Sequence, residues 1–487
     1  MGAQRNSALC ALCTMRCMGF HVIVGVLSSH PVAARGRMLA RPLSTLLLLA
    51  LAAAQPPHPL ARSRRRLYEQ SLRGCRHGSD GVLITLLPNA TVHDTENKTH
   101  AERFAERLSK RAWGRRLQSD ATSIRAVYSA IVEGVAAVLD ESTMEEVLHD
   151  PEVKRIEANC LIVLDDPPPD ANVVVPKREG KRRLGTQSSA PWNLDRIDSR
   201  AGRDGVYNYG NSIGTGAVIY VFDTGLRIDH VDFGGRARPG YSVRCMTPNN
   251  CQPGYLYQGV IDSSSSTCNS HGTHCASSAA GQQWGVAKNA TIVAVQVLSC
   301  TGTGDGAGVL RAIEWAVLDA THHGRPSVLS MSIGGTYSQI ENDMIEAAHI
   351  YGNVVTVAAA GNDASDACAE SPASAPHALT VGSTTFSDGL SGFSNRGPCV
   401  DVLAPGSSIQ AACSETSTAT CSKSGTSMAA PHVTGAVAQL RGRFPSRTAE
   451  WATQTVRCMA TTNAISGVPS NTANALLYAG VAVDGED

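Results

Sequence analysis

The chain has no excess of charge of either sign. Its 487 residues include 42 lysines and arginines and 42 aspartates and glutamates, so the formal net charge is zero. Composition therefore gives no argument for binding to nucleic acid or to a membrane surface. Charged residues make up 17% and hydrophobic residues 43% of the chain, which is typical of a globular protein with a substantial core and an accessory domain.

The N-terminal region lacks an apolar run long enough to cross a membrane comfortably. The run at residues 43–51 is shorter than the roughly 20 residues that a membrane-spanning helix needs. Arg41 precedes this run and an Ala-x-Ala pattern follows it, which is typical of a secretory signal peptide at residues 38–54. Met38 is then the expected start and residues 1–37 an irregular extension. An uncleaved signal anchor is the alternative.

Residues 424–440 present a serine at the start of an apolar helix. Ser427 follows Gly425 and Thr426, and small apolar residues and Pro431 come after it. Proline is tolerated in the first turn of a helix because the amides there have no intrahelical acceptor. The sequence therefore predicts a hydroxyl at the mouth of a buried helix. A core helix that merely begins with a serine is the alternative for this segment alone.

Two further segments favour a catalytic interpretation. Residues 216–222 form a continuous apolar run, typical of a buried parallel strand, and Asp223 follows it. Open α/β sheets place their sites at the carboxyl ends of such strands. His271 stands in a second segment that leads into a helix, so an acid, an imidazole and a hydroxyl occur in that chain order. An imidazole oriented by an anion makes a serine hydroxyl nucleophilic by taking its proton.

These segments resemble the three signatures of the subtilisin-like serine proteases, and residues 271–276 resemble the proteinase K group. The resemblance implies a doubly wound, mainly parallel α/β sheet with helices on both faces. By matching position, it implies Asp223 as the orienting acid, His271 as the general base and Ser427 as the nucleophile. It also implies that the side chain of Asn362 donates to the oxyanion.

Residues 80–165 form a small α+β unit with the predicted order strand, helix, strand, strand, helix, strand. This order is the ferredoxin-like plan. The unit resembles the inhibitor I9-type propeptide of the same protease group, and its position before the protease supports that likeness. The resemblance implies an intramolecular inhibitor and an autoinhibited zymogen. An unrelated interaction module is the alternative.

The predicted organisation has seven parts. They are an extension at 1–37, a signal peptide at 38–54, a basic linker at 55–79, the propeptide at 80–165, a processing linker at 166–189, the catalytic domain at 190–480 and a C-terminal tail at 481–487. The processing linker is rich in proline and polar residues, so we expect it to be flexible and exposed. Self-cleavage near Gly185 and cleavage after Arg183 by a basic-specific protease both stay open.

The resemblance also implies the residues that hold substrate. In this family the substrate lies extended between two edges of a cleft. One edge is matched here by Gly302, Thr303 and Gly304, and the opposite edge by Ser332, Ile333 and Gly334. Main-chain pairing along such edges suits a protease of broad specificity. The implied walls of the primary pocket are Ala358, Ala359 and residues 332–334, which are small and uncharged. An apolar or aromatic side chain is therefore expected before the scissile bond, and no acid among these residues selects lysine or arginine.

Cysteine usage is typical of an exported protein, with ten cysteines after Gly185. The resemblance implies the disulfides Cys268–Cys300 and Cys368–Cys399, and short sequence separation suggests Cys245–Cys251 and Cys413–Cys421. The resemblance further implies that Cys275 is a free thiol beneath the catalytic histidine. A zinc site of His271, His274 and Cys275 is the competing interpretation. The partners of Cys75, Cys160 and Cys458 stay open.

A structural calcium site is implied at the carbonyls of Pro376 and Ala378 and the carboxylate of Asp401, which are hard oxygen ligands. A loop cap is the alternative role of Asp401. The chemistry itself requires no cofactor.

The sequence thus predicts a secreted, monomeric serine endopeptidase that cleaves proteins or peptides and has its own propeptide as inhibitor. It predicts no nucleic acid partner and no stable membrane span. The alternative from another class is a binding protein of the same fold that cleaves itself once and retains its propeptide.

Overall fold

The computed structural model describes residues 59–88, 98–114, 122–165, 167, 182–183, 185–247, 250–257 and 269–480. The chain divides into two compact units, Met1–Ser63 and Arg64–Asp487. The predicted extension, signal peptide and C-terminal tail lie outside the described residues. None of the helices within the described ranges has the length and apolar character needed to cross a membrane.

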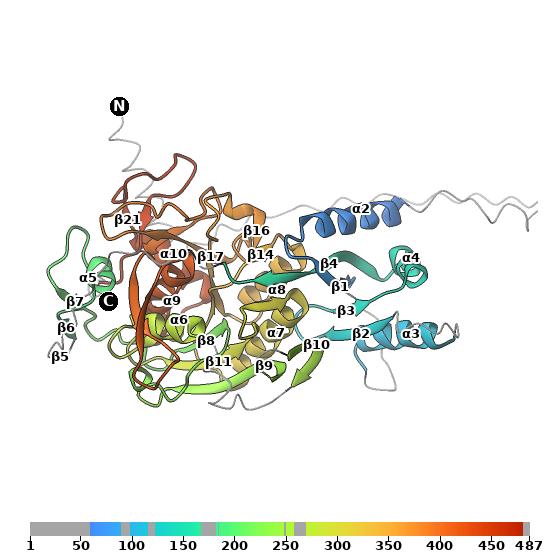
Figure 1. Cartoon of the computed structure of the whole chain (residues 1–487), viewed down its shortest axis with the longest axis horizontal. Coiled ribbons are helices and arrows are strands. Elements are labelled where there is room, and N and C mark those ends of the chain that lie inside the picture. The colour runs from blue at the N-terminus through green and yellow to red at the C-terminus, as the bar shows by residue number, and fades with distance from the viewer. Residues whose placement is uncertain are drawn as a thin grey trace, which may run out of the picture. The chain divides into compact units, whose positions relative to one another are not determined.

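The elements before the processing linker form the predicted small α+β unit (Figure 1). They are α2 (Pro59–Gly74), β1 (Ser79–Leu86), α3 (His100–Gly114), β2 (Ser123–Tyr128), β3 (Gly134–Val138), α4 (Glu141–His149) and β4 (Val153–Val163). The strands lie in the order β4-β1-β3-β2, and each neighbouring pair is antiparallel. The ferredoxin-like plan of the propeptide is therefore confirmed.

Helix α2 shows that the prediction of a basic linker at residues 55–79 was wrong. Arg64 in this helix is only 7% exposed, and its guanidinium donates hydrogen bonds to the carbonyls of Leu148 and Asp150, both at 2.8 Å. One guanidinium offers five N–H donors, so a buried arginine can satisfy several carbonyls at once. The basic composition suggested an exposed linker. The carbonyls that bind Arg64 lie more than eighty positions further along the chain, so no local pattern indicated that this arginine is buried.

A ten-stranded sheet forms the centre of the predicted catalytic domain. Its order is β10-β9-β11-β8-β13-β15-β17-β18-β22-β21, parallel throughout except for the edge pairs β10/β9 and β22/β21. The bounds are β8 (Val218–Asp223), β9 (Ala237–Thr247), β10 (Asn250–Tyr257), β11 (Thr291–Gln296), β13 (Ser327–Met331), β15 (Val355–Ala359), β17 (Ala378–Thr384), β18 (Val402–Pro405), β21 (Thr461–Thr462) and β22 (Ala475–Leu476). The predicted doubly wound, mainly parallel fold is confirmed.

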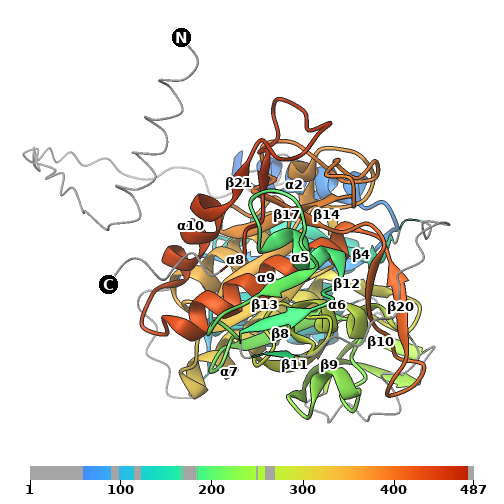
Figure 2. The same cartoon turned by 90° about the vertical axis from the view of Figure 1, so that its left-hand side faces the viewer.

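Helices cover both faces of this sheet, and Figure 2 looks onto the face that α9 crosses. The helices are α5 (Trp192–Ile197), α6 (His271–Ala280), α7 (Gly306–His323), α8 (Gln339–Ile350), α9 (Thr426–Arg443) and α10 (Ala449–Met459). Along β8, Ile219 and Val221 pack with α6 and α9, whereas Tyr220 packs with α7 and α8. A strand covered on both faces must be apolar throughout. Asp223 follows Ile219 and Val221 in the alternation along β8, so it lies on the face that α6 and α9 cover.

Short elements complete the catalytic region. They are β5 (Arg182–Arg183), β6 (Thr186–Ser188), β7 (Val206–Asn208), η1 (Val231–Phe233), β12 (Thr303–Asp305), β14 (Gly335–Thr336), η3 (Ala367–Ala369), β16 (Glu370–Ser371), β19 (Ile409–Ala412) and β20 (Thr420–Lys423). Strand β12 adds to the propeptide sheet beside β4. Strand β6 pairs with β5 and β7, so the end of the predicted processing linker belongs to a small sheet and was wrongly expected to be flexible.

Candidate active site

Asp223 and His271 form a fully buried pair at the end of the large sheet where β8 has its carboxyl terminus. Asp223 ends β8 and His271 begins α6. His271 Nδ1 lies 2.8 Å from each carboxylate oxygen of Asp223, and Asp223 Oδ1 also accepts the backbone N–H of Thr224 at 2.7 Å. Asn269 Oδ1 accepts the backbone N–H of His271 at 2.9 Å. A carboxylate on Nδ1 directs proton transfer to the other ring nitrogen, Nε2.

Ser427 lies in the first turn of α9, and its carbonyl has partners from outside the helix. Pro431 lies inside α9 and not in its first turn as expected, so its missing N–H removes the i+4 donor to the Ser427 carbonyl. The hydroxyl of Ser332 donates to this carbonyl at 2.9 Å, and the thiol of Cys275 donates at 3.3 Å. These two side chains replace the lost helical hydrogen bond.

The serine and the histidine lie on either side of Cys275. Its Sγ is 3.9 Å from His271 Nδ1 and 3.3 Å from the Ser427 carbonyl oxygen. The Ser427 hydroxyl donates to the Ser332 carbonyl at 3.2 Å. The structure thus gathers the three predicted side chains at one sheet edge, with the acid and the imidazole in direct contact and the serine on the neighbouring helix.

Cys275 forms no disulfide and is buried, and burial raises the pKa of its thiol. Zinc binds a thiolate, whereas the Cys275 thiol uses its proton to donate to the Ser427 carbonyl. His274 Nε2 contacts the Ile409 carbonyl at 2.9 Å, and His271 Nδ1 is held by Asp223. These residues therefore do not fit the competing zinc site.

Asn362 lies beside Ser427, at the turn after β15. Its Oδ1 accepts hydrogen bonds from the backbone N–H and the hydroxyl of Thr426 at 2.8 and 2.9 Å, which orients the amide. Its Nδ2 donates to the carbonyl of Asp165 at 2.7 Å. A fixed donor aimed at a main-chain carbonyl is the arrangement that stabilises an oxyanion.

The end of the propeptide occupies the cleft as an extended strand. Residues 161–163 pair antiparallel with Thr303–Asp305, and the N–H of Leu164 donates to the carbonyl of Gly302 at 2.9 Å. The second predicted edge, residues 332–334, lines the same cleft as this strand. The propeptide thus pairs with one of the two edges predicted for substrate and lies beside the other.

Two family matches cover most of this structure. The subtilase family matches residues 214–481 and the peptidase inhibitor I9 family matches residues 82–163. The chain belongs to the subtilase family. Its I9 match lies within the predicted propeptide, and this subtilase is a serine-type endopeptidase of the subtilisin-like kind.

Relatives of this subtilase cover most of its length. It is 37% identical over 365 residues to the extracellular serine proteinase of Thermus sp. (strain Rt41A), covering 75% of this chain and 80% of the relative. It is 37% identical over 401 residues to the subtilisin-like serine protease Pen c 1 of Penicillium citrinum, covering 81% and 90%. The crystal structure of a cold adapted subtilisin-like serine proteinase matches with a TM-score of 0.53 and 41% identity, covering 60% of this chain and 99% of that one.

The pocket beside Asn362 contains acids that the sequence analysis did not assign to it. Its lining includes the predicted residues Ser332, Gly334 and Ala359. Ala358, which was also predicted to form a wall of this pocket, is not part of its lining and packs in the core with α7. Glu370 and Asp363 also line the pocket, together with Arg76 of the propeptide. Glu370 was missed because it follows Asn362 by eight residues through a loop, and no motif or periodicity marks its return.

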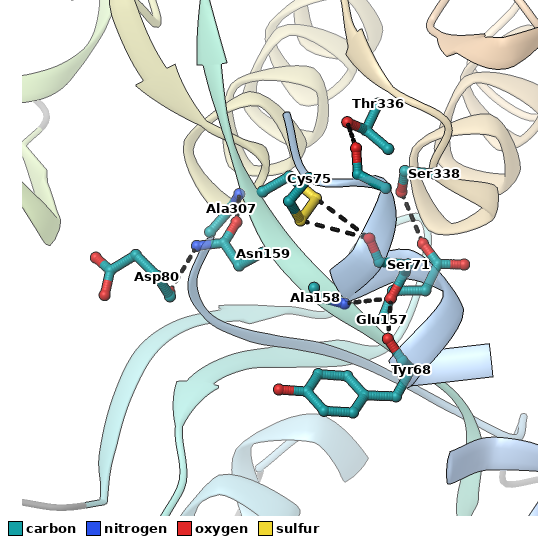
Figure 3. The surroundings of a disulfide bond; sticks show 12 residues. Tyr68, Ser71, Cys75, Asp80, Glu157, Ala158, Asn159, Ala307, Thr336 and Ser338 are labelled. Atoms are coloured by element: carbon teal, nitrogen blue, oxygen red, sulfur yellow. Dashed lines mark hydrogen bonds between the residues drawn. A yellow bond between two sulfur atoms is a disulfide. The ribbon is translucent and has the colours of Figure 1, made fainter. Parts of the chain in front are cut away.

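A disulfide joins Cys75, just after α2, to Cys160 on β4 (Figure 3). Contacts between the propeptide and the catalytic region surround it. They are Thr336 Oγ1 to the Gly74 carbonyl at 2.8 Å, Ser338 Oγ to Glu157 Oε2 at 2.8 Å and the Ala307 N–H to Asn159 Oδ1 at 2.9 Å. The disulfide therefore fixes the turn after α2 to the strand that enters the cleft.

The other expected disulfides have different outcomes. The structure contains Cys368–Cys399 and Cys413–Cys421. Cys300 is disulfide-bonded, and its expected partner Cys268 lies outside the described residues. Cys245 and Cys251 are register partners between β9 and β10, but their side chains lie outside the described part of the structure.

The expected calcium ligands are engaged by an arginine. Arg457 Nε donates to Asp401 Oδ1 at 3.0 Å, and its Nη2 donates to the Ala378 carbonyl at 3.4 Å. The other carboxylate oxygen of Asp401 accepts the N–H of Thr380 at 3.0 Å. A guanidinium already supplies the positive charge at two of the three expected ligands. Pro376, Ala378 and Asp401 therefore do not fit a calcium ion, which corrects the sequence-based expectation.

Asp401→Asn should lower the free energy of unfolding by about 1–3 kcal/mol, because it leaves the partly buried Arg457 without its anion. EDTA should change the thermal midpoint of this variant and of the wild type by the same amount. Calorimetry with and without EDTA measures both effects. Asp229→Asn, which breaks a surface pair with Arg227, is the control. An EDTA effect present in the wild type and lost in Asp401→Asn would show calcium at this site.

Proposed function

We propose that this subtilase is a secreted, monomeric endopeptidase made as an autoinhibited zymogen. Residues 80–165 are the inhibitor, to which the disulfide Cys75–Cys160 joins the preceding helix α2 and the turn that carries Arg76. Residues 190–480 are the catalytic domain, and protein or peptide chains are the substrates. One observation carries the proposal: the Asp165 carbonyl lies 2.7 Å from Asn362 Nδ2 while the preceding strand pairs with Thr303–Asp305. A chain held in this way presents a main-chain carbonyl beside Ser427. The Thermus relative, an extracellular serine proteinase by name, supports secretion.

The proposed reaction forms and hydrolyses an acyl-enzyme. The Ser427 hydroxyl turns from the Ser332 carbonyl toward His271 Nε2 and gives up its proton as its oxygen bonds to the substrate carbonyl carbon. Asp223 stabilises the imidazolium, and Asn362 donates to the oxyanion. The C–N bond then breaks, and the amine leaves with the proton from His271. Water, deprotonated by the same histidine, releases the acid, so the reaction requires no cofactor.

The bond after Asp165 is the proposed site of self-cleavage. Its carbonyl is the one that Asn362 binds. Gly185, the site considered from the sequence, instead has its carbonyl bound by the N–H groups of Tyr209 and Gly210 at 3.0 and 2.9 Å. Glu370 and Asp363 line the pocket for which an apolar or aromatic preference was expected, and two acids do not favour such a side chain.

Ser427→Ala should leave the full chain uncleaved and lower peptide turnover on the order of 10⁶-fold, because the nucleophile is lost. Asn362→Ala should lower kcat about 10²- to 10³-fold and stay folded. Electrophoresis, mass spectrometry of the new termini and peptide kinetics measure these effects, and the exposed Ser470→Ala is the control. The wild type should be cut after Asp165 and labelled at Ser427 by a serine-reactive phosphonate. A secreted chain that retains its propeptide and cleaves no peptide would support the binding-protein alternative.

A pair of acids at the propeptide interface makes inhibition depend on pH. Glu157 of β4 accepts hydrogen bonds from Ser338 Oγ at 2.8 Å and from the Ile340 N–H at 3.4 Å, at the start of α8. Burial raises the pKa of Glu341 to about 8, and the charge of Glu157 adds to the rise. Burial also raises the pKa of Glu157. With raised pKa values, these two carboxyls hold their protons in the complex, so this pair favours the complex at low pH and weakens it as pH rises through about 8.

The cleaved propeptide should stay bound at about pH 6 and be released at about pH 9, the window set by the raised pKa of Glu341. Size-exclusion chromatography of the cleaved complex measures the fraction retained. Glu341→Gln should flatten the pH dependence, whereas Glu346→Gln, exposed on the same helix, should not. Retention that is equal at both pH values in the wild type contradicts this account.

A further inference from the structure

The pocket beside Asn362 contains more negative than positive groups among its described residues. Asp363 and Glu370 line it from the catalytic region and Asp165 from the propeptide. Arg76 faces these acids: its Nη2 lies 3.1 Å from Glu370 Oε1, and its Nη1 contacts Asp363 Oδ2. One arginine of the propeptide therefore contacts two acids of the protease and offsets part of their negative charge.

The Glu370 carboxylate lies between the two segments that flank the pocket. A Cβ placed on Gly361 would lie 2.6 Å from Glu370 Oε2, and one placed on Gly334 would lie 3.5 Å away. Glu370 is 6% exposed, and Asn395 Nδ2 donates to its Oε1 at 3.3 Å. Burial raises the pKa of Glu370 to about 7 even though Arg76 opposes the rise. A carboxylate so enclosed is stabilised by a nearby cation.

Arg76 stays in the pocket only while the propeptide is docked. It follows Cys75, and the disulfide to Cys160 fixes this turn to β4 (Figure 3). When the propeptide leaves, Arg76 leaves with it. The mature protease keeps Asp363 and Glu370 and loses the counter-charge that the zymogen provides.

We infer that Glu370 and Asp363 make this pocket select an arginine or a lysine in the residue before the scissile bond. The inference rests on the proposed function, in which the carbonyl bound by Asn362 belongs to that residue. A substrate arginine reproduces the two contacts of Arg76, one nitrogen to each acid. Arginine is favoured over lysine because its planar guanidinium reaches both carboxylates at once.

The apolar or aromatic preference was predicted from the small residues of the pocket walls alone. The inferred selection of arginine or lysine replaces it. Glu370 contributes more to it than Asp363 does. The Glu370 carboxylate is enclosed, whereas the Asp363 side chain is 34% exposed, so water and salt screen its charge. The two acids therefore predict effects of different size when each is neutralised.

The test uses mature protease, freed of its propeptide, and four peptides that differ only in arginine, lysine, methionine or phenylalanine before the scissile bond. In the wild type, kcat/KM for the arginine peptide should exceed that for methionine and phenylalanine by about tenfold or more. Glu370→Gln should lower kcat/KM for the basic peptides roughly 10- to 100-fold and leave the other two within about threefold. Asp363→Asn should cost the basic peptides only a few-fold, and Glu346→Gln should change nothing.

The pH dependence provides a second readout. The ratio of kcat/KM for arginine over phenylalanine cancels the titration of His271, which both substrates share. Glu370 attracts the substrate cation only when its carboxyl is ionised. This ratio should therefore rise between about pH 6 and 9 in the wild type and stay flat in Glu370→Gln. The groups that face this carboxylate in the mature protease are Asp363 and Asn395, since Arg76 has left.

The outcomes separate this inference from the proposed function. Phenylalanine or methionine preferred over arginine, with the ratio unchanged by Glu370→Gln, overturns the inference and leaves the protease function standing. Cleavage of none of the four peptides, with no labelling by a serine-reactive phosphonate, overturns both. If Glu370→Gln does not fold, benzamidine should still inhibit wild-type cleavage of the phenylalanine peptide competitively, and a lack of inhibition contradicts the inference.

Discussion

The buried contact between Asp223 and His271 is the constraint on which the rest of the catalytic region depends. A charged carboxylate inside a protein is tolerated only when hydrogen bonds satisfy it, so β8 must end where α6 begins. The two elements approach so closely that a Cβ at Gly272 would lie 3.0 Å from the Asp223 side chain. Helix α9 approaches α6 as tightly, since a Cβ at Gly435 would lie 2.6 Å from the Ala279 carbonyl. The small residues of both helices follow from this geometry.

The same constraint explains how far the sequence could predict the structure. The central strand and the helix that carries Ser427 have local patterns, because burial on both faces requires apolar or small residues along their whole length. Arg457, Glu370 and Arg64 have no such pattern. Each meets its partners only after distant segments pack; Arg457, for example, binds Asp401 from 56 positions further along the chain. Sequence reasoning therefore predicted the fold and named three side chains that the structure brings close together, and it missed the charges that occupy the pocket and the expected calcium site.

The propeptide interface combines two kinds of interaction with different consequences. Main-chain pairing of β4 with β12 demands little of the side chains and does not titrate. The charged contacts do depend on conditions, because Glu157 and Glu341 are close enough for the charge of one to raise the pKa of the other. The proposed inhibitor, which later leaves, combines both kinds. Main-chain pairing alone would not respond to pH, whereas the two acids would provide the proposed pH trigger for release.

The acidic pocket also bears on how the N-terminus of the catalytic domain is produced. In the cleavage proposed after Asp165, the side chain of Asp165 shares the pocket with Asp363 and Glu370, and Arg76 of the same chain supplies a cation to these acids. On the specificity inferred above, a mature molecule that acts on another chain has lost Arg76, and its substrate supplies the positive charge. The basic run at residues 181–183 stands just before Gly185 and supplies such a charge. One pair of carboxylates would thus order two cleavages, the first dependent on a propeptide arginine and the second on an arginine of the linker.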